Sequence, residues 1–246
     1  MRRSLEYGGE ESGVSSTSRE RPWWSHGRRP EVTSMNAATS ARVVLVHGLW
    51  LNGLAMLPLG WQLNRCGFEV VRFSYASVGK HLEHNADRLA RFCREQGTEP
   101  LQLVGHSLGG LLILAALDRN DDLKVRRALL IGSPYAGTAA AIGLARSALG
   151  QRMLGRTLKD WMRMSRPSIP NGVEVGVIAG NVPFGLGRLV ARLPNPHDGV
   201  VLVDETRVPG VKDSIVLPIN HTGMLFSPAV ARAACAFLRN GKFGHA

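Results

Sequence analysis

The stretch that most restricts the possible fold is residues 101–117. It begins with an apolar run at 101–104, continues with GHSLG at 105–109, and passes directly into an apolar run that predicts a helix. A G-x-S-x-G pattern between a buried strand and a helix indicates a sharp turn that holds its serine in strained backbone geometry. Gly105 and Gly109 avoid the clashes that side chains would make beside that turn. The sequence therefore predicts strand, tight turn at Ser107, and helix.

Strand and helix patterns alternate on both sides of this stretch. The run at 42–46 is continuous and β-branched, which is typical of a strand that is covered on both faces. The predicted strands are residues 42–46, 68–75, 101–104, 127–133, 174–180 and 214–219, and the main predicted helices are 54–66 and 81–96 together with the one after Ser107. Strands separated by helices predict an α/β fold with a doubly wound, mainly parallel sheet.

The first 40 residues differ in composition from the rest. They are rich in Ser, Gly, Arg and Glu and show neither the hydrophobic period of a helix nor that of a strand. We therefore expect a disordered tail at 1–40 and one domain at 41–246. Arg2 and Arg3 are not followed by an apolar segment, so no secretion signal is predicted. Trp23 and Trp24 form the only feature there that could dock. Either Met1 or Met35 could be the true start.

Composition restricts the function classes. With 246 residues and 44% hydrophobic content, the chain can bury a substantial core. Cys66, Cys93 and Cys235 have no C-x-x-C spacing, which predicts neither a disulfide framework nor a zinc site and fits a reducing, cytoplasmic compartment. The formal charge of +11 is compatible with binding to nucleic acid, to anionic lipid or to acidic substrates, or with solubility alone. No nucleic-acid-binding motif accompanies it, so no nucleic-acid partner is expected.

Two loops after Ser107 carry the groups that a nucleophilic serine requires. A serine hydroxyl needs a histidine to take its proton and a carboxylate to orient that histidine, in the chain order Ser, acid, His. His221 directly follows the last predicted strand, where the base is expected. His197 precedes that strand, so we interpret it as a loop residue.

The acid is predicted to be Asp198. It lies in the loop after the strand at 174–180, which is where the acid belongs in this chain order. Asp204 is the main rival, and Asp213 is a weaker one because it begins the last strand.

The loop after the first strand should complete the site. Gly48 lets the backbone turn so that an N–H can face the serine. We therefore predict the backbone N–H groups of Leu49 and Leu108 as the oxyanion donors. His47 is interpreted as a structural residue that braces this loop.

These segments give the chain a family resemblance over roughly residues 42–238. Four segments are similar to segments of α/β-hydrolases, and within that superfamily they are most similar to those of lipases and esterases. They are VHGL at 46–49, GHSLGG at 105–110, HDGVV at 197–201 and HTGML at 221–225. The last two segments resemble bacterial triacylglycerol-lipase-like and PGAP-like hydrolases. The resemblance implies hydrolysis of a small-molecule or lipid ester through an acyl-enzyme, with no metal and no organic cofactor. From the sequence we expect neither the secretion signal nor the cysteine pair that several secreted lipases carry.

Other functions use the same residues. Relatives that share this triad also hydrolyse thioesters or transfer acyl groups, so the fold alone does not choose the reaction. A non-catalytic binding protein on a hydrolase fold is the alternative from another class. The complete set of serine, acid and histidine argues against it.

The segment at 137–171 is predicted to form a cap over the serine. Five basic residues recur in it at helical spacing and share one stripe: Arg152, Arg156, Lys159, Arg163 and Arg166. Apolar residues lie on another face: Leu154, Leu158, Trp161 and Met162. Such a helix could lie on an anionic membrane surface or cover an acyl pocket, or it could pack on the core with its arginines solvated. All three interpretations remain open from the sequence.

Overall fold

The computed structural model describes residues 42–97, 99–185 and 193–244. Within them lies one sheet in the order β2-β1-β3-β4-β5-β6, and every pairing in it is parallel. The strands are β1 (Arg42–Val46), β2 (Glu69–Phe73), β3 (Leu101–His106), β4 (Val125–Ile131), β5 (Glu174–Gly180) and β6 (Asp213–Leu217). The predicted doubly wound sheet is confirmed. The predicted tail, with Trp23, Trp24 and Met35, lies outside the described residues.

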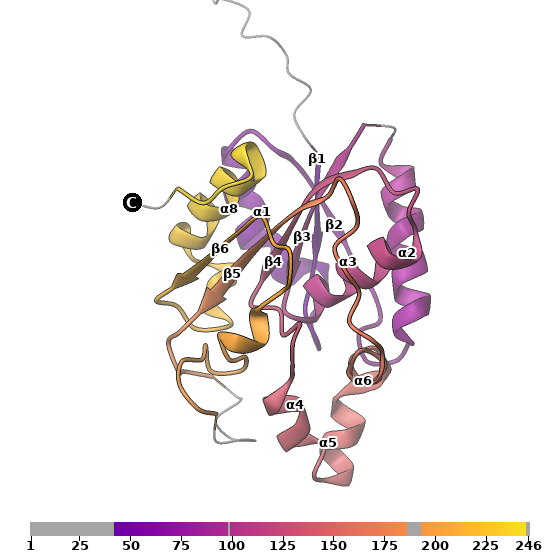
Figure 1. Ribbon diagram of the computed structural model, residues 1–246, viewed down its shortest axis with the longest axis vertical. Helices are drawn as coiled ribbons and strands as arrows, with labels where there is room; N and C mark the ends of the chain where they lie inside the picture. The colour runs from indigo at the N-terminus through magenta and orange to yellow at the C-terminus, as the bar shows by residue number, and fades with distance from the viewer. Residues whose placement is uncertain (1–41, 98, 186–192, 245–246) are drawn as a thin grey trace, which may run out of the picture. The chain divides into compact units, whose positions relative to one another are not determined.

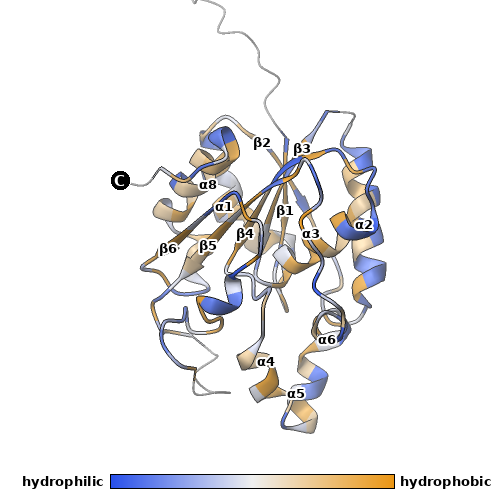
Figure 2. Cartoon of the chain, viewed as in Figure 1, coloured by the Kyte–Doolittle hydropathy of each residue, from blue (hydrophilic) through white to orange (hydrophobic). Residues whose placement is uncertain are grey.

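Helices cover both faces of the sheet (Figure 1). One face carries α2 (Leu82–Glu95) and α3 (Leu108–Arg119), and the other carries α1 (Leu57–Arg65) and α8 (Pro228–Asn240). Successive residues of β1 point to opposite faces, so Val44 packs in the first core cluster and Leu45 in the second. Figure 2 shows the hydrophilic side of α2 turned away from the sheet. None of the helices in the described ranges is long and apolar enough to cross a bilayer.

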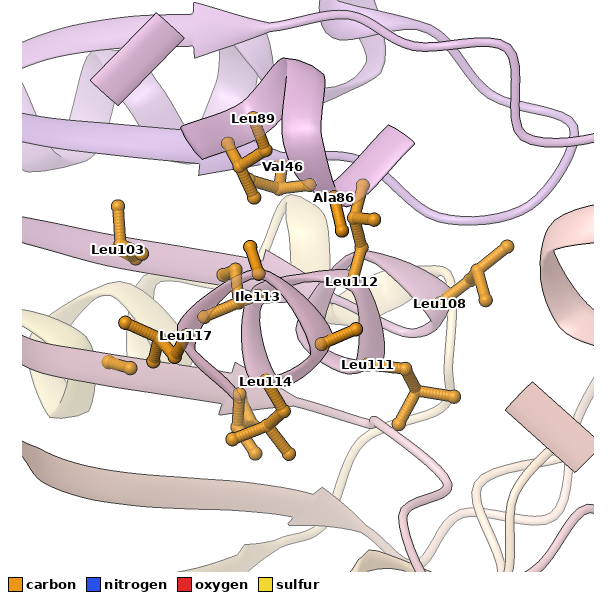
Figure 3. Packing of buried hydrophobic residues seen from close by; sticks show 14 of the residues in the cluster. Val46, Ala86, Leu89, Leu103, Leu108, Leu111, Leu112, Ile113, Leu114 and Leu117 are labelled. Carbon is orange, nitrogen blue, oxygen red and sulfur yellow. The ribbon is translucent and has the colours of Figure 1, made fainter. Parts of the chain in front are cut away.

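Helix α3 forms the centre of the larger core cluster. Residues 108–117 are all buried, and their side chains radiate from every side of the helix (Figure 3). A helix that is apolar all round must be enclosed on all sides. The helix after Ser107 is thus held rigidly against β1, β3 and β4.

Some predicted boundaries were wrong. The helix expected at 54–66 begins as a 3-10 turn, η2 (Gly53–Met56), before α1 starts. Asn52 favours this start because its side chain accepts the N–H of Leu54 at 2.9 Å. Strand β6 ends at Leu217, so His221 follows the strand after a short loop and not directly.

Cys66 and Cys235 form a disulfide between the end of α1 and α8. The prediction that the cysteines are unpaired was wrong for these two. They are 169 residues apart in sequence, so no local spacing could pair them, but α1 and α8 lie on the same face of the sheet. Cys93 is free and buried, and burial raises the pKa of its thiol to about 12. The disulfide removes the basis for expecting a reducing compartment.

The disulfide should contribute strongly to stability. We expect the double change Cys66→Ser and Cys235→Ser to lower the free energy of unfolding by up to about 5 kcal/mol, because a cross-link that closes so long a loop restricts the unfolded chain. Urea unfolding of the two proteins, each with and without dithiothreitol, measures this. The reductant should shift only the wild-type midpoint, and equal midpoints for oxidised and reduced wild type would contradict the expectation.

The segment at 137–171 contains three short helices beyond the carboxyl ends of the strands (Figure 1). They are α4 (Ala139–Leu144), α5 (Ala148–Met153) and α6 (Gly155–Arg163). The prediction of one continuous basic helix was wrong, because the helix is interrupted between α5 and α6, at Gly155. That residue has φ +70°, and a Cβ on it would lie 2.5 Å from the Cα of Val78. The next N–H, that of Arg156, donates to the Val78 carbonyl at 2.9 Å.

The break divides the predicted basic stripe. Arg152 belongs to α5, whereas Arg156, Lys159 and Arg163 share α6. Arg166 lies past the end of α6, where its guanidinium is 5.1 Å from the ring of Trp161 and donates to the carbonyl of Trp161 at 2.6 Å. Arg166 is therefore not part of a solvated stripe.

The apolar face of α6 packs on α2. Leu158 and Trp161 are buried in the larger core cluster. Polar contacts fix the same interface: Asn85 donates to the Thr157 hydroxyl at 2.9 Å, and the Asp160 carboxylate accepts the N–H of Leu82 at 2.9 Å. The core-packing interpretation therefore holds for this face of α6.

Candidate active site

Ser107 lies at a strained turn between β3 and α3. Its backbone has φ 55° and ψ −123°, a left-handed region that costs a non-glycine residue about 1–3 kcal/mol. Its N–H donates to the Ile131 carbonyl at 2.8 Å, which ties the turn to β4. A Cβ on Gly105 would lie 2.4 Å from the Gly110 nitrogen, and one on Gly109 would lie 2.2 Å from the Val46 oxygen. The tight turn predicted from the motif therefore needs both glycines.

The structure brings His221 and Asp198 together. The Nδ1 atom of His221 lies 2.7 Å from the Oδ2 atom of Asp198, and the two side chains are only 10% and 1% exposed. The other carboxylate oxygen accepts the N–H groups of Val200 and Val201 at 2.9 and 2.7 Å. Because a carboxylate can only accept, the hydrogen of this bond belongs to Nδ1 of His221, and Nε2 is then the ring nitrogen that can accept one.

The rival acids lie elsewhere. Asp204 pairs with Arg207 at 2.8 Å and its side chain is 72% exposed. Asp213 stands at the opposite end of the sheet, at the start of β6, where its carboxylate accepts the N–H of Phe243 at 2.7 Å. Neither pairs with His221.

Two further histidines support the surrounding loops. His197 is buried, and its Nδ1 accepts the N–H of Gly199 at 3.0 Å within the loop that carries Asp198. In the loop after β1, Nε2 of His47 accepts the N–H of Tyr75 at 3.2 Å, so its Nδ1 donates to the Gly48 carbonyl at 2.8 Å. Burial lowers the pKa of His47 and keeps the ring neutral. These contacts are those of loop-bracing residues.

His106 is a residue of the site that the sequence analysis missed. Its Nε2 donates to the backbone carbonyl of His221 at 3.0 Å, and the two rings lie 4.7 Å apart. Burial, with the neighbouring His221 as a smaller cause, lowers the pKa of His106 to about 3. This neutral histidine connects β3 to the loop of His221. The only signal in the sequence was its place in GHSLG, next to Ser107.

The residues predicted as oxyanion donors line the same cavity as Ser107. Leu49 and Leu108 line the cavity that Ser107 lines, and Leu108 is the first residue of α3. A Cβ on Gly48 would lie only 3.1 Å from the Cβ of Ser107, so the loop after β1 approaches the serine closely.

A cavity of about 540 Å³ opens over Ser107 and His221. Its walls are mostly apolar, and the cap contributes side chains such as those of Leu144, Met153 and Leu158. Among the described residues, no lysine or arginine lines it. Trp50, at φ 60°, connects the loop after β1 to the cap, because its indole Nε1 donates to the Met153 carbonyl at 2.7 Å.

Metal ligands do not converge in the described part of the chain. No group of three or more His, Cys, Asp and Glu side chains there could hold a metal ion.

A covered parallel sheet, a serine at a strained strand-to-helix turn and a histidine–carboxylate pair in later loops define the α/β hydrolase class. A family model described as the Alpha/beta hydrolase family matches residues 43–241. The chain belongs to that family and is a hydrolase, and the family predicted from the sequence is confirmed. No curated protein matches the chain significantly by sequence.

Solved structures share the fold at low sequence identity. The Bacillus licheniformis lipase BlEst2 in its mature form superposes with a TM-score of 0.65 at 20% identity, over 82% of this chain and 92% of that one. The metagenomic carboxyl esterase MGS0156 gives 0.60 at 16%, over 75% and 65%. The Bacillus subtilis carboxylesterase CesB gives 0.51 at 16%, over 82% and 84%.

Proposed function

We propose that the protein is a serine hydrolase that cleaves carboxylic esters through an acyl-enzyme. In this proposal Ser107 is the nucleophile, His221 the base and Asp198 the acid that orients it. The observation that carries the proposal is the cavity, which joins Ser107 at its strained turn to His221, 2.7 Å from a buried carboxylate.

In the proposed mechanism each residue has the role that its chemistry allows. The free Nε2 of His221 takes the proton of Ser107 as the hydroxyl attacks the ester carbonyl. The N–H groups of Leu49 and Leu108 hold the oxyanion, and the helix dipole of α3 adds to their effect. His221 then protonates the leaving alcohol and activates the water that releases the acid. The buried carboxylate of Asp198 stabilises the imidazolium in both steps.

The cavity favours an ester with an apolar acyl group. Its volume is within the range of sites for drug-sized ligands, and mostly apolar walls would desolvate an alkyl chain. Several structural neighbours carry the names lipase or carboxylesterase, which agrees with ester hydrolysis as the reaction.

Labelling with a fluorophosphonate and turnover of a chain-length series of p-nitrophenyl esters test this function. We expect labelling, and a higher kcat/KM for medium acyl chains than for acetate. Thioesters with the same acyl chains distinguish thioester from ester preference. A protein that is neither labelled nor active on any of these substrates would be a binding protein on a hydrolase fold.

We further propose that the rim of the cavity contacts an anionic lipid surface. Large apolar side chains at this rim are exposed: Trp50, Leu51, Met153 and Phe226. Exposed apolar groups of this size mark interaction sites when they gather in one place. Arg152, Arg156 and Arg163 are exposed on the neighbouring cap helices α5 and α6 and would attract anionic headgroups.

Replacing Arg152, Arg156 and Arg163 with glutamine should weaken binding to anionic vesicles by on the order of 100-fold at low salt, since each basic residue near such a surface contributes about 1 kcal/mol. Vesicle co-sedimentation measures the effect. Hydrolysis of a short soluble ester should stay unchanged. The matched control replaces Arg91, Arg126 and Arg232, which are exposed on other parts of the fold. If both triple variants lose the same affinity, net charge alone governs binding.

A further inference from the structure

Glu205 is a buried carboxylate in the wall of the cavity that holds Ser107. Its residue is 7% exposed and belongs to the 3-10 turn η3 (Asp204–Thr206). One carboxylate oxygen accepts the N–H of Ala139 at 2.5 Å, and the other accepts the N–H of Leu202 at 3.0 Å. No lysine, arginine or histidine in the described ranges forms an ion pair with it. A buried carboxylate in a ligand cavity, without a cation from the described residues, requires an explanation.

Two backbone hydrogen bonds hold the carboxylate of Glu205 in the cavity wall. Each oxygen accepts one backbone N–H, so the side chain is fixed by contacts on both of its oxygens. The surrounding cavity wall is mostly apolar and, in the described residues, contains no lysine or arginine; its two histidines, His106 and His221, form no ion pair with Glu205. Because charges interact over longer distances in a medium of low dielectric constant, Glu205 acts on any charged group that enters the cavity.

We propose that Glu205 sets the charge preference of the active site. The cavity accepts esters whose acyl group is neutral or cationic and rejects esters with an anionic acyl group. The inference rests on the ester hydrolysis proposed above and names its substrate class. An anionic group would lose its hydration beside a carboxylate that pairs with no lysine or arginine of the described residues. The carboxylate product of hydrolysis meets the same repulsion, which favours its release over that of the neutral ester.

The surface of the protein has the opposite preference. The net charge of +11 attracts anionic substrates from solution and raises their rate of encounter. Salt separates the two effects, because it screens exposed charges far more than buried ones. Charge discrimination by Glu205 should therefore persist at about 0.5 M NaCl, where the Debye length is only a few ångströms.

The test uses three p-nitrophenyl esters of equal chain length that end in a methyl, a carboxylate or a trimethylammonium group. At about 0.5 M NaCl we expect kcat/KM for the cationic ester to exceed that for the anionic ester by about tenfold or more. Glu205→Gln should bring this ratio close to one. Glutamine has a single oxygen and can accept only one of the two backbone N–H groups, but a ratio measured within one protein cancels any general loss of activity from this change.

Asp204→Asn is the matched control. It removes the neighbouring carboxylate, which is exposed and outside the cavity lining, and it should leave the ratio at its wild-type value. An unchanged ratio in folded Glu205→Gln would overturn the assignment to Glu205.

Wild-type protein alone can also overturn the proposal, which matters if Glu205→Gln does not fold. Equal turnover of the cationic and anionic esters at high salt would do so. Failure to hydrolyse even the methyl-ended ester would contradict the proposed function instead. In that case, thermal protection of Ser107→Ala by hexyltrimethylammonium and by hexanoate still tests the charge preference: stronger protection by the cation supports it, and equal protection overturns it.

Discussion

Ser107→Ala is expected to lower kcat for p-nitrophenyl esters by about 10⁶ and to abolish fluorophosphonate labelling, because the hydroxyl forms the covalent bond to the acyl group. The fold should be retained, since Ser107 is held by its backbone N–H to Ile131 and by the glycines around it. Kinetics and circular dichroism measure the two expectations.

Ser107→Gly provides a companion to this experiment. Glycine removes the same hydroxyl and also tolerates φ 55° without strain. It should be as inactive as the alanine variant. Relief of the backbone strain should raise its free energy of unfolding above that of the alanine variant by about 1 kcal/mol, and the greater entropy of glycine in the unfolded chain reduces this gain. If either variant turned over activated esters at the wild-type rate, Ser107 would not be the nucleophile.

Asp198→Asn is expected to lower kcat by about 10⁴. The N–H groups of Val200 and Val201 require an oxygen at one position of the side chain, so the amide nitrogen of asparagine must face His221. There it would donate to Nδ1 and force the hydrogen of the imidazole onto Nε2, which could then no longer accept the serine proton. The change thus replaces the working tautomer by the wrong one.

The acid assignment is tested by comparison with Asp204→Asn. That carboxylate is exposed and paired with Arg207, so its loss should change kcat by less than about twofold. The reverse ranking of the two variants would assign the acid to Asp204.

The sequence predicted those parts of the fold that depend on local backbone demands. The glycines around Ser107 and the β-branched run of β1 are local signals, because tight approach and burial on two faces restrict residue type directly. The Asp198–His221 pairing was predicted from chain order alone, and the structure places these two side chains in contact. Their catalytic roles stay predictions.

What the sequence did not predict depends on contacts between distant segments. The Cys66–Cys235 disulfide arises because two helices pack on one face of the sheet. The helix break at Gly155 arises from its contact with Val78, although a glycine inside a helical pattern was a visible warning. The burial of Glu205 was not predicted, because two neighbouring acidic residues are typical of solvated surface. Only the turn η3 directs the Glu205 side chain inward.

The disulfide also decides what a single cut in the chain can do. Ser107, Asp198 and His221 all lie between Cys66 and Cys235 in the sequence. A protease that cuts one peptide bond between the two cysteines therefore produces two fragments that stay covalently joined as one molecule. Such a nicked protein would migrate as the intact chain until it is reduced. Before reduction, the proposed nucleophile and base of a nicked molecule could lie on different polypeptides that the disulfide still joins.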